Sequence, residues 1–331
     1  MRITRETLIR IARETAQKRA LSDPGLIAAY LTGSVCTDNP FLGNTTDIDI
    51  VFVHAGLPGV HREILPLTPE VHLDIIHNPR SDYEKPKELR IHPWLGPELY
   101  DPMPLYVTQH FFEFVQAGVR AEYHQPLNVL ARARRYAENA RQIWSGMQPS
   151  QKTDPTLLLS YLKAVSHAAN AIAALNGGPL AERRFLLQFP SRAEAAGVPG
   201  LPDLLLGLLG NEKTDSATLG GFLPAWEKAF LDASGRPRAH ENLAAPRLAY
   251  YKMAFESMLA GESPWSILWP LIHTWTLAAA VLPPTHRPDW QAACETLELT
   301  GEAFRSRLDG LDHFLDEVEE ILEKYAISQG V

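Results

Sequence analysis

Two aspartates separated by a single residue are the first feature of this sequence that could do chemistry. Asp47 and Asp49 lie in residues 47–54, a short run rich in Ile, Val and Phe that predicts a β-strand. Successive side chains of a strand point to opposite faces, so both carboxylates are expected on one face and Ile48 on the other. Two carboxylates held this close repel each other unless a cation neutralises them, and a divalent metal ion is the usual solution.

A third acid lies in residues 71–77, a second predicted strand whose alternation puts His72 and Asp74 on one face. If this strand lies beside the first, Asp74 completes a triad of carboxylates. Such a triad suits nucleotidyl transfer with two Mg²⁺ ions, in which Asp74 would be a metal ligand, the general base, or both. Because Mg²⁺ prefers oxygen ligands, we interpret His72 as a hydrogen-bonded strand residue.

A glycine–serine turn offers a place for phosphate groups. Gly33 and Ser34 directly follow residues 26–32, which predict a further strand. A tight turn there lets backbone N–H groups and a hydroxyl approach the β- and γ-phosphates of a nucleotide. Each fragment alone is common in purely structural positions. Together they indicate a catalytic site, because semi-buried carboxylates without a partner are costly.

These three pieces resemble the DNA polymerase beta-type nucleotidyltransferase superfamily. The resemblance rests on Thr32-Gly33-Ser34, a loop, Asp47-Ile48-Asp49, and later Leu73-Asp74-Ile75, and it covers roughly the first hundred residues. It implies two Mg²⁺ ions held by the three aspartates, ATP or another nucleoside triphosphate as co-substrate at Gly33 and Ser34, and a catalytic role for the triad. A degenerate, inactive copy of the fold is the alternative, and the intact acids argue against it.

The order of elements predicts an α+β protein. A small nucleotidyltransferase-type domain with a mixed sheet and helices is expected over residues 1–122, followed by an all-α domain over residues 123–331. Within the first domain, residues 98–102 look like a last short extended piece. Helical periodicity is found in residues 4–20, 107–118, 127–144, 157–175, 201–209, 221–231, 247–259, 265–281 and 304–325, and turn chemistry predicts loops at 149–155, 176–179 and 234–237.

Composition limits the compartment and the class of partner. The uncharged residues 265–282 approach membrane-spanning length, but Pro270 and His273 interrupt them and no Lys/Arg cluster flanks them, so a buried helix is expected and no membrane partner. The N-terminus lacks the pattern of a secretion signal, which places the protein in the cytoplasm with Cys36 and Cys294 as reduced thiols. The net charge of −8 and the lack of a basic stripe argue against a nucleic-acid partner.

The layout, a small catalytic domain followed by a helical one, is similar to the aminoglycoside adenylyltransferases that modify streptomycin and spectinomycin. That similarity implies a nucleotide and a small-molecule acceptor as partners, with AMP transferred from ATP to a hydroxyl. The alternative is a nucleotide-binding regulatory or protein-modifying, antitoxin-like member of the fold, which would have a protein partner. A third hypothesis, RNA tailing, conflicts with the acidic charge.

Two charged clusters of the second domain have open interpretations. Acids in residues 302–323 would be the solvated face of an amphipathic helix or, less simply, a wall for a cationic drug. Arginines in residues 132–141 would face solvent or steady a triphosphate, and Lys163 is a similar candidate.

Overall fold

The computed structural model describes residues 3–108, 110–147, 154–210 and 214–331. The chain divides into two compact units, Met1–Tyr123 and His124–Val331. The first unit contains a mixed β-sheet with helices, and every regular element described in the second unit is helical. The expected α+β class is therefore confirmed.

Five strands form the sheet of the first unit, in the order β3-β4-β2-β1-β5. They are β1 (Leu26–Thr32), β2 (Thr46–His54), β3 (Arg62–Pro66), β4 (Val71–Pro79) and β5 (Met103–Val107). The pair β2–β4 is parallel, and the other three pairs are antiparallel. The three strands expected from sequence are present within two residues of their predicted ends, whereas β3 was not predicted.

The prediction of an extended piece over residues 98–102 is wrong. This part of the chain contains the short helix α3 (Leu95–Tyr100), and the strand β5 begins only at Met103. Pro97 lies in the first turn of α3, where a helix has no use for the missing N–H, and Glu98 adds an acid that the N-terminal end favours. The helix expected over residues 107–118 also begins later, as α4 (Phe111–Arg120), because Val107 still belongs to β5.

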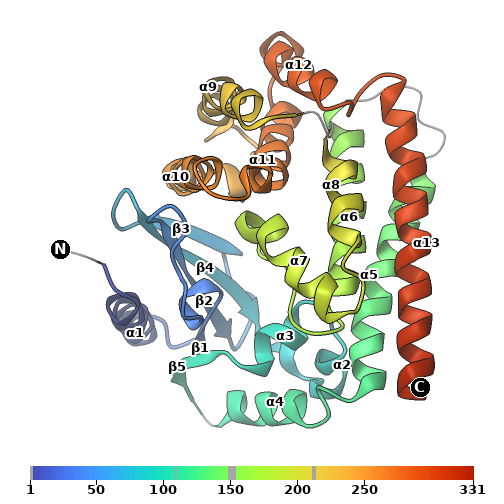
Figure 1. Ribbon diagram of the computed structural model, residues 1–331. Coiled ribbons are helices and arrows are strands. Elements are labelled where there is room, and N and C mark those ends of the chain that lie inside the picture. Colours follow the sequence, from blue (N-terminus) through green and yellow to red (C-terminus); the bar gives the residue numbers. More distant parts are fainter. Residues whose placement is uncertain (1–2, 109, 148–153, 211–213) are drawn as a thin grey trace. The chain divides into compact units, whose positions relative to one another are not determined.

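Helices cover both faces of this sheet (Figure 1). The helix α1 (Arg5–Ser22) packs Leu8, Ala12 and Ala16 against one face, which includes Ile48 and Ile50 of β2. The other face packs against α4 and its neighbours α2 (Pro86–Arg90) and α3. Strand alternation therefore divides the core in two, and it puts Asp47, Asp49, His72 and Asp74 on the α4 side.

A chain of hydrogen bonds crosses the α4 side from Asn78 to Glu98. Asn78 donates to the Tyr83 hydroxyl (2.9 Å), the Tyr83 and Tyr30 hydroxyls are 3.0 Å apart, and Tyr30 donates to Glu98 Oε1 (2.5 Å). Burial raises the pKa of the Glu98 carboxyl, although the Tyr30 hydrogen bond opposes the increase. Ionised Glu98 is thus destabilising for the folded chain.

This network gives a pH dependence with a definite sign. Because the pKa of Glu98 is raised on folding, its contribution to stability is complete below its unfolded pKa and is lost as pH rises through the folded value. Glu98→Gln keeps the acceptor for Tyr30 and removes the charge. We expect the variant to melt at a higher temperature than the wild type at pH 8, with the difference vanishing toward pH 4. A difference that is independent of pH would contradict this assignment.

Nine α-helices are described in the second unit. They are α5 (Pro126–Met147), α6 (Pro155–Ala173), α7 (Phe185–Ala195), α8 (Leu201–Leu209), α9 (Ser216–Ala233), α10 (Arg247–Leu259), α11 (Leu268–Val281), α12 (Pro288–Thr296) and α13 (Ala303–Gln329). Of the predicted loops, 176–179 and 234–237 are non-helical. In the loop predicted over 149–155, residues 149–153 lie outside the described residues, Asp154 is non-helical, and Pro155 already begins α6. Neither α7, with Pro190 inside it, nor α12 was predicted.

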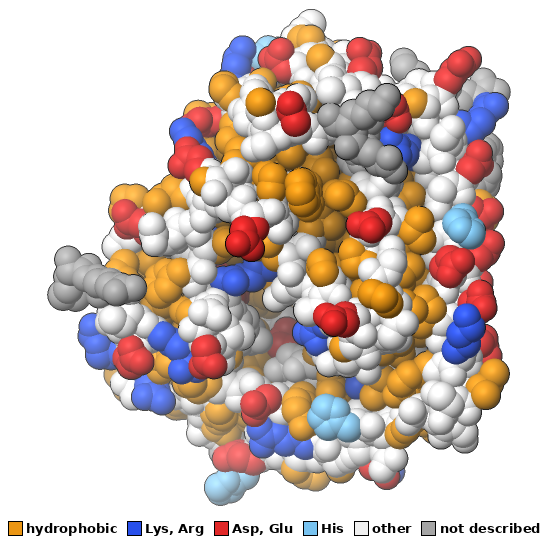
Figure 2. Space-filling view, viewed as in Figure 1, with side chains coloured by type: hydrophobic (Ala, Val, Ile, Leu, Met, Phe, Trp, Pro, Cys, Tyr) orange, Lys and Arg blue, Asp and Glu red, His pale blue; other side chains and the backbone are white. Residues whose placement is uncertain are grey.

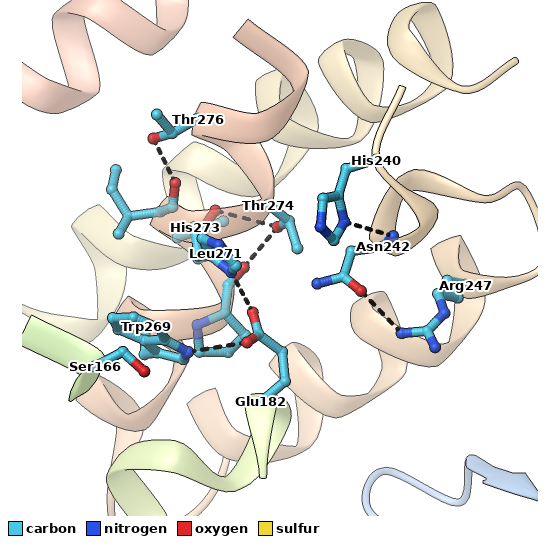
Figure 3. Close-up of polar contacts among 12 residues, drawn as sticks. Ser166, Glu182, His240, Asn242, Arg247, Trp269, Leu271, His273, Thr274 and Thr276 are labelled. Carbon is cyan, nitrogen blue, oxygen red and sulfur yellow. Dashed lines mark hydrogen bonds and ion pairs between the residues drawn. The ribbon is translucent and has the colours of Figure 1, made fainter. Parts of the chain in front are cut away.

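The uncharged stretch near residue 270 forms α11, a core helix of this unit. Its polar side chains bond internally: the Thr274 hydroxyl donates to the Pro270 carbonyl (2.6 Å) and accepts from Trp226 (2.9 Å). His273 Nδ1 lies 2.6 Å from Glu182, which also accepts from Trp269 (Figure 3). Attraction to Glu182 outweighs burial and raises the pKa of His273. Among the described residues, no helix is both long enough and apolar enough to cross a bilayer.

The two charged clusters of the second unit pair with each other. α5 and α13 run side by side, and Arg141 of α5 contacts Asp312, Asp316 and Glu319 of α13 at 2.5 to 2.8 Å. Arg134 pairs with Glu323 at 2.8 Å. These ion pairs are partly or fully exposed, so each adds little stability. On the face viewed in Figure 2, acidic and basic side chains are interspersed, and the acids follow the right-hand side where α13 lies.

Candidate functional site

The parallel pairing of β2 with β4 brings the predicted acids together. In the register of the two strands, Asp49 is the partner of Asp74, and Asp47 is the partner of His72. All four side chains therefore project from neighbouring positions on one face of the sheet. The sequence alone left it as an assumption that residues 71–77 form a strand beside residues 47–54. The structure shows this pairing.

Three of these side chains can share one metal ion. Ligand atoms of Asp47, His72 and Asp74 all lie within 4.8 Å of one another, and the three residues are buried. Two carboxylates and an imidazole are donors for a divalent cation. The donor chemistry thus fits a metal. The group differs from the expected triad in one member, because His72 takes the place of Asp49.

Asp49 lies against the glycine turn instead. Gly33, which follows β1, has φ of 71° and ψ of −155°. Residues other than glycine rarely adopt this backbone conformation. A Cβ atom built on Gly33 would lie 1.9 Å from Asp49 Oδ2. Only glycine lets the backbone approach this carboxylate so closely, which explains the residue type that the sequence shows here.

The turn after Gly33 is held to the start of β2. Ser34 begins a short 3₁₀ helix, Ser34–Cys36, and its hydroxyl lies 3.2 Å from that of Thr46. Thr46 in turn donates to the Pro40 carbonyl (3.0 Å) and is fully buried. The turn is thereby tied to Thr46, the residue before Asp47 in β2, whose side chain alternates to the face of the sheet opposite the acids.

Arg62 is a residue of this site that the sequence did not indicate. It comes from the edge strand β3, where it lies opposite Ile76 of β4. Its guanidinium donates two hydrogen bonds to Asp74, from Nε to Oδ1 and from Nη2 to Oδ2, both 2.7 Å. The side chain of Asp74 is 1% exposed and that of Arg62 is 23% exposed. The buried acid Asp74 thus has a cationic partner, Arg62, in addition to its neighbours Asp47 and His72.

The α1 side of the same strands carries a separate polar network. Glu63, the next residue of β3, accepts from Arg19 of α1 (2.8 Å) and lies 2.9 Å from His77 Nε2. His77 Nδ1 is 2.9 Å from His54 Nε2. Burial lowers the pKa of His77, against the influence of Glu63. Adjacent residues of β3 therefore hold β4 from both faces of the sheet.

Comparison with other proteins adds a distant likeness. No family model matches the chain, and no curated protein matches it. Among solved structures, the chain is similar to a nucleotidyltransferase-like protein from Exiguobacterium sibiricum 255-15, with 12% identity and a TM-score of 0.27, over 96% of this chain and 78% of that one. At this TM-score the likeness carries no inference about function, which rests on the residues of the site.

Proposed function

We propose that this chain is a nucleotidyltransferase that moves a nucleoside monophosphate, AMP from ATP, to a hydroxyl of a small polar acceptor such as an aminoglycoside. The observation that carries the proposal is the buried pair of carboxylates, Asp47 and Asp74, on parallel neighbouring strands beside the glycine turn. Arg62 neutralises one of the two buried charges by its ion pair with Asp74, and a divalent cation among Asp47, His72 and Asp74 would neutralise the other. The position of the two carboxylates next to a turn suited to phosphate favours chemistry on a nucleotide.

The proposed roles follow the positions of the residues. Asp47 and Asp74, with His72 in the same ligand group, would bind one Mg²⁺ ion, and Asp49 would contribute to the second ion of the expected chemistry. When bound, the metal stabilises charge on the triphosphate. Gly33 and Ser34 would hold the β- and γ-phosphates. The acceptor oxygen forms a bond to the α-phosphorus, the bond from that phosphorus to the β-phosphate oxygen breaks, and pyrophosphate leaves. A carboxylate of the triad, Asp74 in the expected scheme, takes up the hydroxyl proton.

The test is pyrophosphate release by the purified protein with ATP, Mg²⁺ and a panel of aminoglycosides. We expect release that depends on the acceptor, stops with a chelator, and falls at least about a hundredfold in Asp49→Asn, because charge stabilisation at the reacting phosphates is lost. Mn²⁺ should be included because His72 belongs to the donor group.

Three outcomes would count against this proposal. Silence of the wild type across panels of nucleotides and acceptors would remove its support. Transfer of labelled AMP to a protein instead of a small molecule would favour the protein-modifying alternative. Equal release by the wild type and Asp49→Asn would contradict the role proposed for Asp49.

A further inference from the structure

The bond between Arg62 and Asp74 determines how the acid is presented to its neighbours. A planar guanidinium that donates two parallel hydrogen bonds fixes the plane of a carboxylate, which a single bond does not. Here both bonds are 2.7 Å, and Asp74 is buried, so few other orientations are open to it. Each carboxylate oxygen has a second acceptor site, and one of these oxygens lies within 4.8 Å of the ligand atoms of Asp47 and His72.

We propose that Arg62 is the positioning residue of the metal site: its guanidinium orients Asp74 so that one oxygen faces the divalent cation shared with Asp47 and His72. This inference rests on the metal site of the proposed function but not on the identity of the acceptor. Arg62 comes from β3, a short edge strand, so β3 serves the site as well as the sheet. Loss of a residue that orients a metal ligand commonly weakens metal binding by roughly 10- to 100-fold.

The sign of the effect depends on which property of Arg62 dominates. Its positive charge next to a cation site weakens metal binding, whereas its fork geometry strengthens it. Arg62→Lys separates the two properties, because the ammonium keeps the charge but cannot donate two bonds in one plane. If orientation dominates, Arg62→Lys loses metal affinity even though the charge is unchanged.

The chain offers a matched control in Arg19. Like Arg62, this arginine donates to a carboxylate, in this case that of Glu63 in β3. It does so through one nitrogen only, and on the opposite face of the sheet. Arg19→Lys therefore makes the same chemical change to an arginine–carboxylate pair of the same strand. Any general weakening of β3 should occur in both variants.

The experiment measures Mn²⁺ binding to the full chain without nucleotide, by electron paramagnetic resonance and calorimetry, with melting temperatures of the metal-free proteins. We expect Arg62→Lys to bind Mn²⁺ about tenfold more weakly than the wild type, and Arg19→Lys to bind it within twofold of the wild type. In turnover assays, half-saturation by metal should shift by the same factor while kcat at saturating metal stays within about threefold.

Equal Mn²⁺ affinity in the wild type and Arg62→Lys would overturn the proposal and leave Arg62 as a clamp between β3 and β4. Should Arg62→Lys fail to fold, Arg62→Gln decides: weaker binding supports orientation, and tighter binding shows that charge repulsion dominates and overturns it. Failure of the transferase reaction is distinguishable, because the Mn²⁺ measurements need no acceptor. A wild type that binds no Mn²⁺ would reject the metal site and this role together.

Discussion

Replacing Asp47 with Asn is expected to lower nucleotidyl transfer by roughly 10³-fold while leaving the fold intact. The residue is 7% exposed and belongs to the group whose ligand atoms lie within 4.8 Å of one another. Asn has the same shape but no charge, so both metal binding and charge stabilisation in the transition state are lost. Pyrophosphate release and Mn²⁺ binding measure the two losses separately.

Stability should respond differently from activity. Arg62 compensates the charge of Asp74, so the repulsion that Asp47→Asn removes in the metal-free protein is small, and the variant is expected to melt close to the wild type. Asp38→Asn is the matched control, because Asp38 is exposed in the loop between the glycine turn and β2 and makes the same change of charge. Loss of activity together with a lower melting temperature in Asp47→Asn would argue for a structural role of this acid.

Gly33→Ala is expected to give the second large effect, on stability and activity together. The new Cβ would lie 1.9 Å from Asp49 Oδ2 and 2.7 Å from Asp49 Cγ, and φ of 71° with ψ of −155° strains any residue with a side chain. Backbone strain of this kind costs about 1 to 3 kcal/mol. Because Asp49 must also move, transfer should fall by at least about a hundredfold, in the range seen for loss of one charge-stabilising group.

Two further variants show whether the effect of Gly33→Ala comes from the contact with Asp49 or from the backbone conformation. Gly59→Ala serves as the control, since a Cβ there meets no atom within 4 Å and φ is not positive. In the double variant Gly33→Ala/Asp49→Ala the contacts with Asp49 Oδ2 and Cγ are absent, whereas the tight 3.2 Å contact with the Cβ of residue 49 and the backbone strain persist. Part of the lost free energy of unfolding should therefore return, with no recovery of activity. If Gly33→Ala melted like Gly59→Ala, the close approach to Asp49 would be refuted.

Local pattern was enough to predict that the polar residues of each strand share one face. The period of two puts Asp47 and Asp49 on one side of β2, and His72 and Asp74 on one side of β4. The glycine after β1 indicates an unusual backbone conformation. These features depend on residues close together in the sequence. The buried, uncharged helix α11 was predictable for the same reason.

The rest of the site depends on side-chain packing between strands that are distant in sequence. β3 has five residues, of which Arg62 and Glu63 are charged and Pro66 cannot donate to the ladder, so no apolar pattern marks it as a strand. The bonds from Arg62 to Asp74 exist only because β3 pairs with β4. Similarly, the entry of His72 into the ligand group depends on its register with Asp47.

The parallel register of β2 and β4 has a consequence for which length changes the chain can tolerate. Shifting β4 by one residue would replace His72 and Asp74 on the α4 side by Leu73 and Ile75, and would turn both polar residues into the opposite core. One residue inserted within β4 should thus abolish both the core packing of this strand and the site. The loop at residues 55–61 is different: it is largely exposed and lies at the end of β2 away from the acids, so extra residues there should leave the pairing unchanged. Chains that differ from this one by insertions or deletions in that loop should therefore keep the same arrangement of site residues.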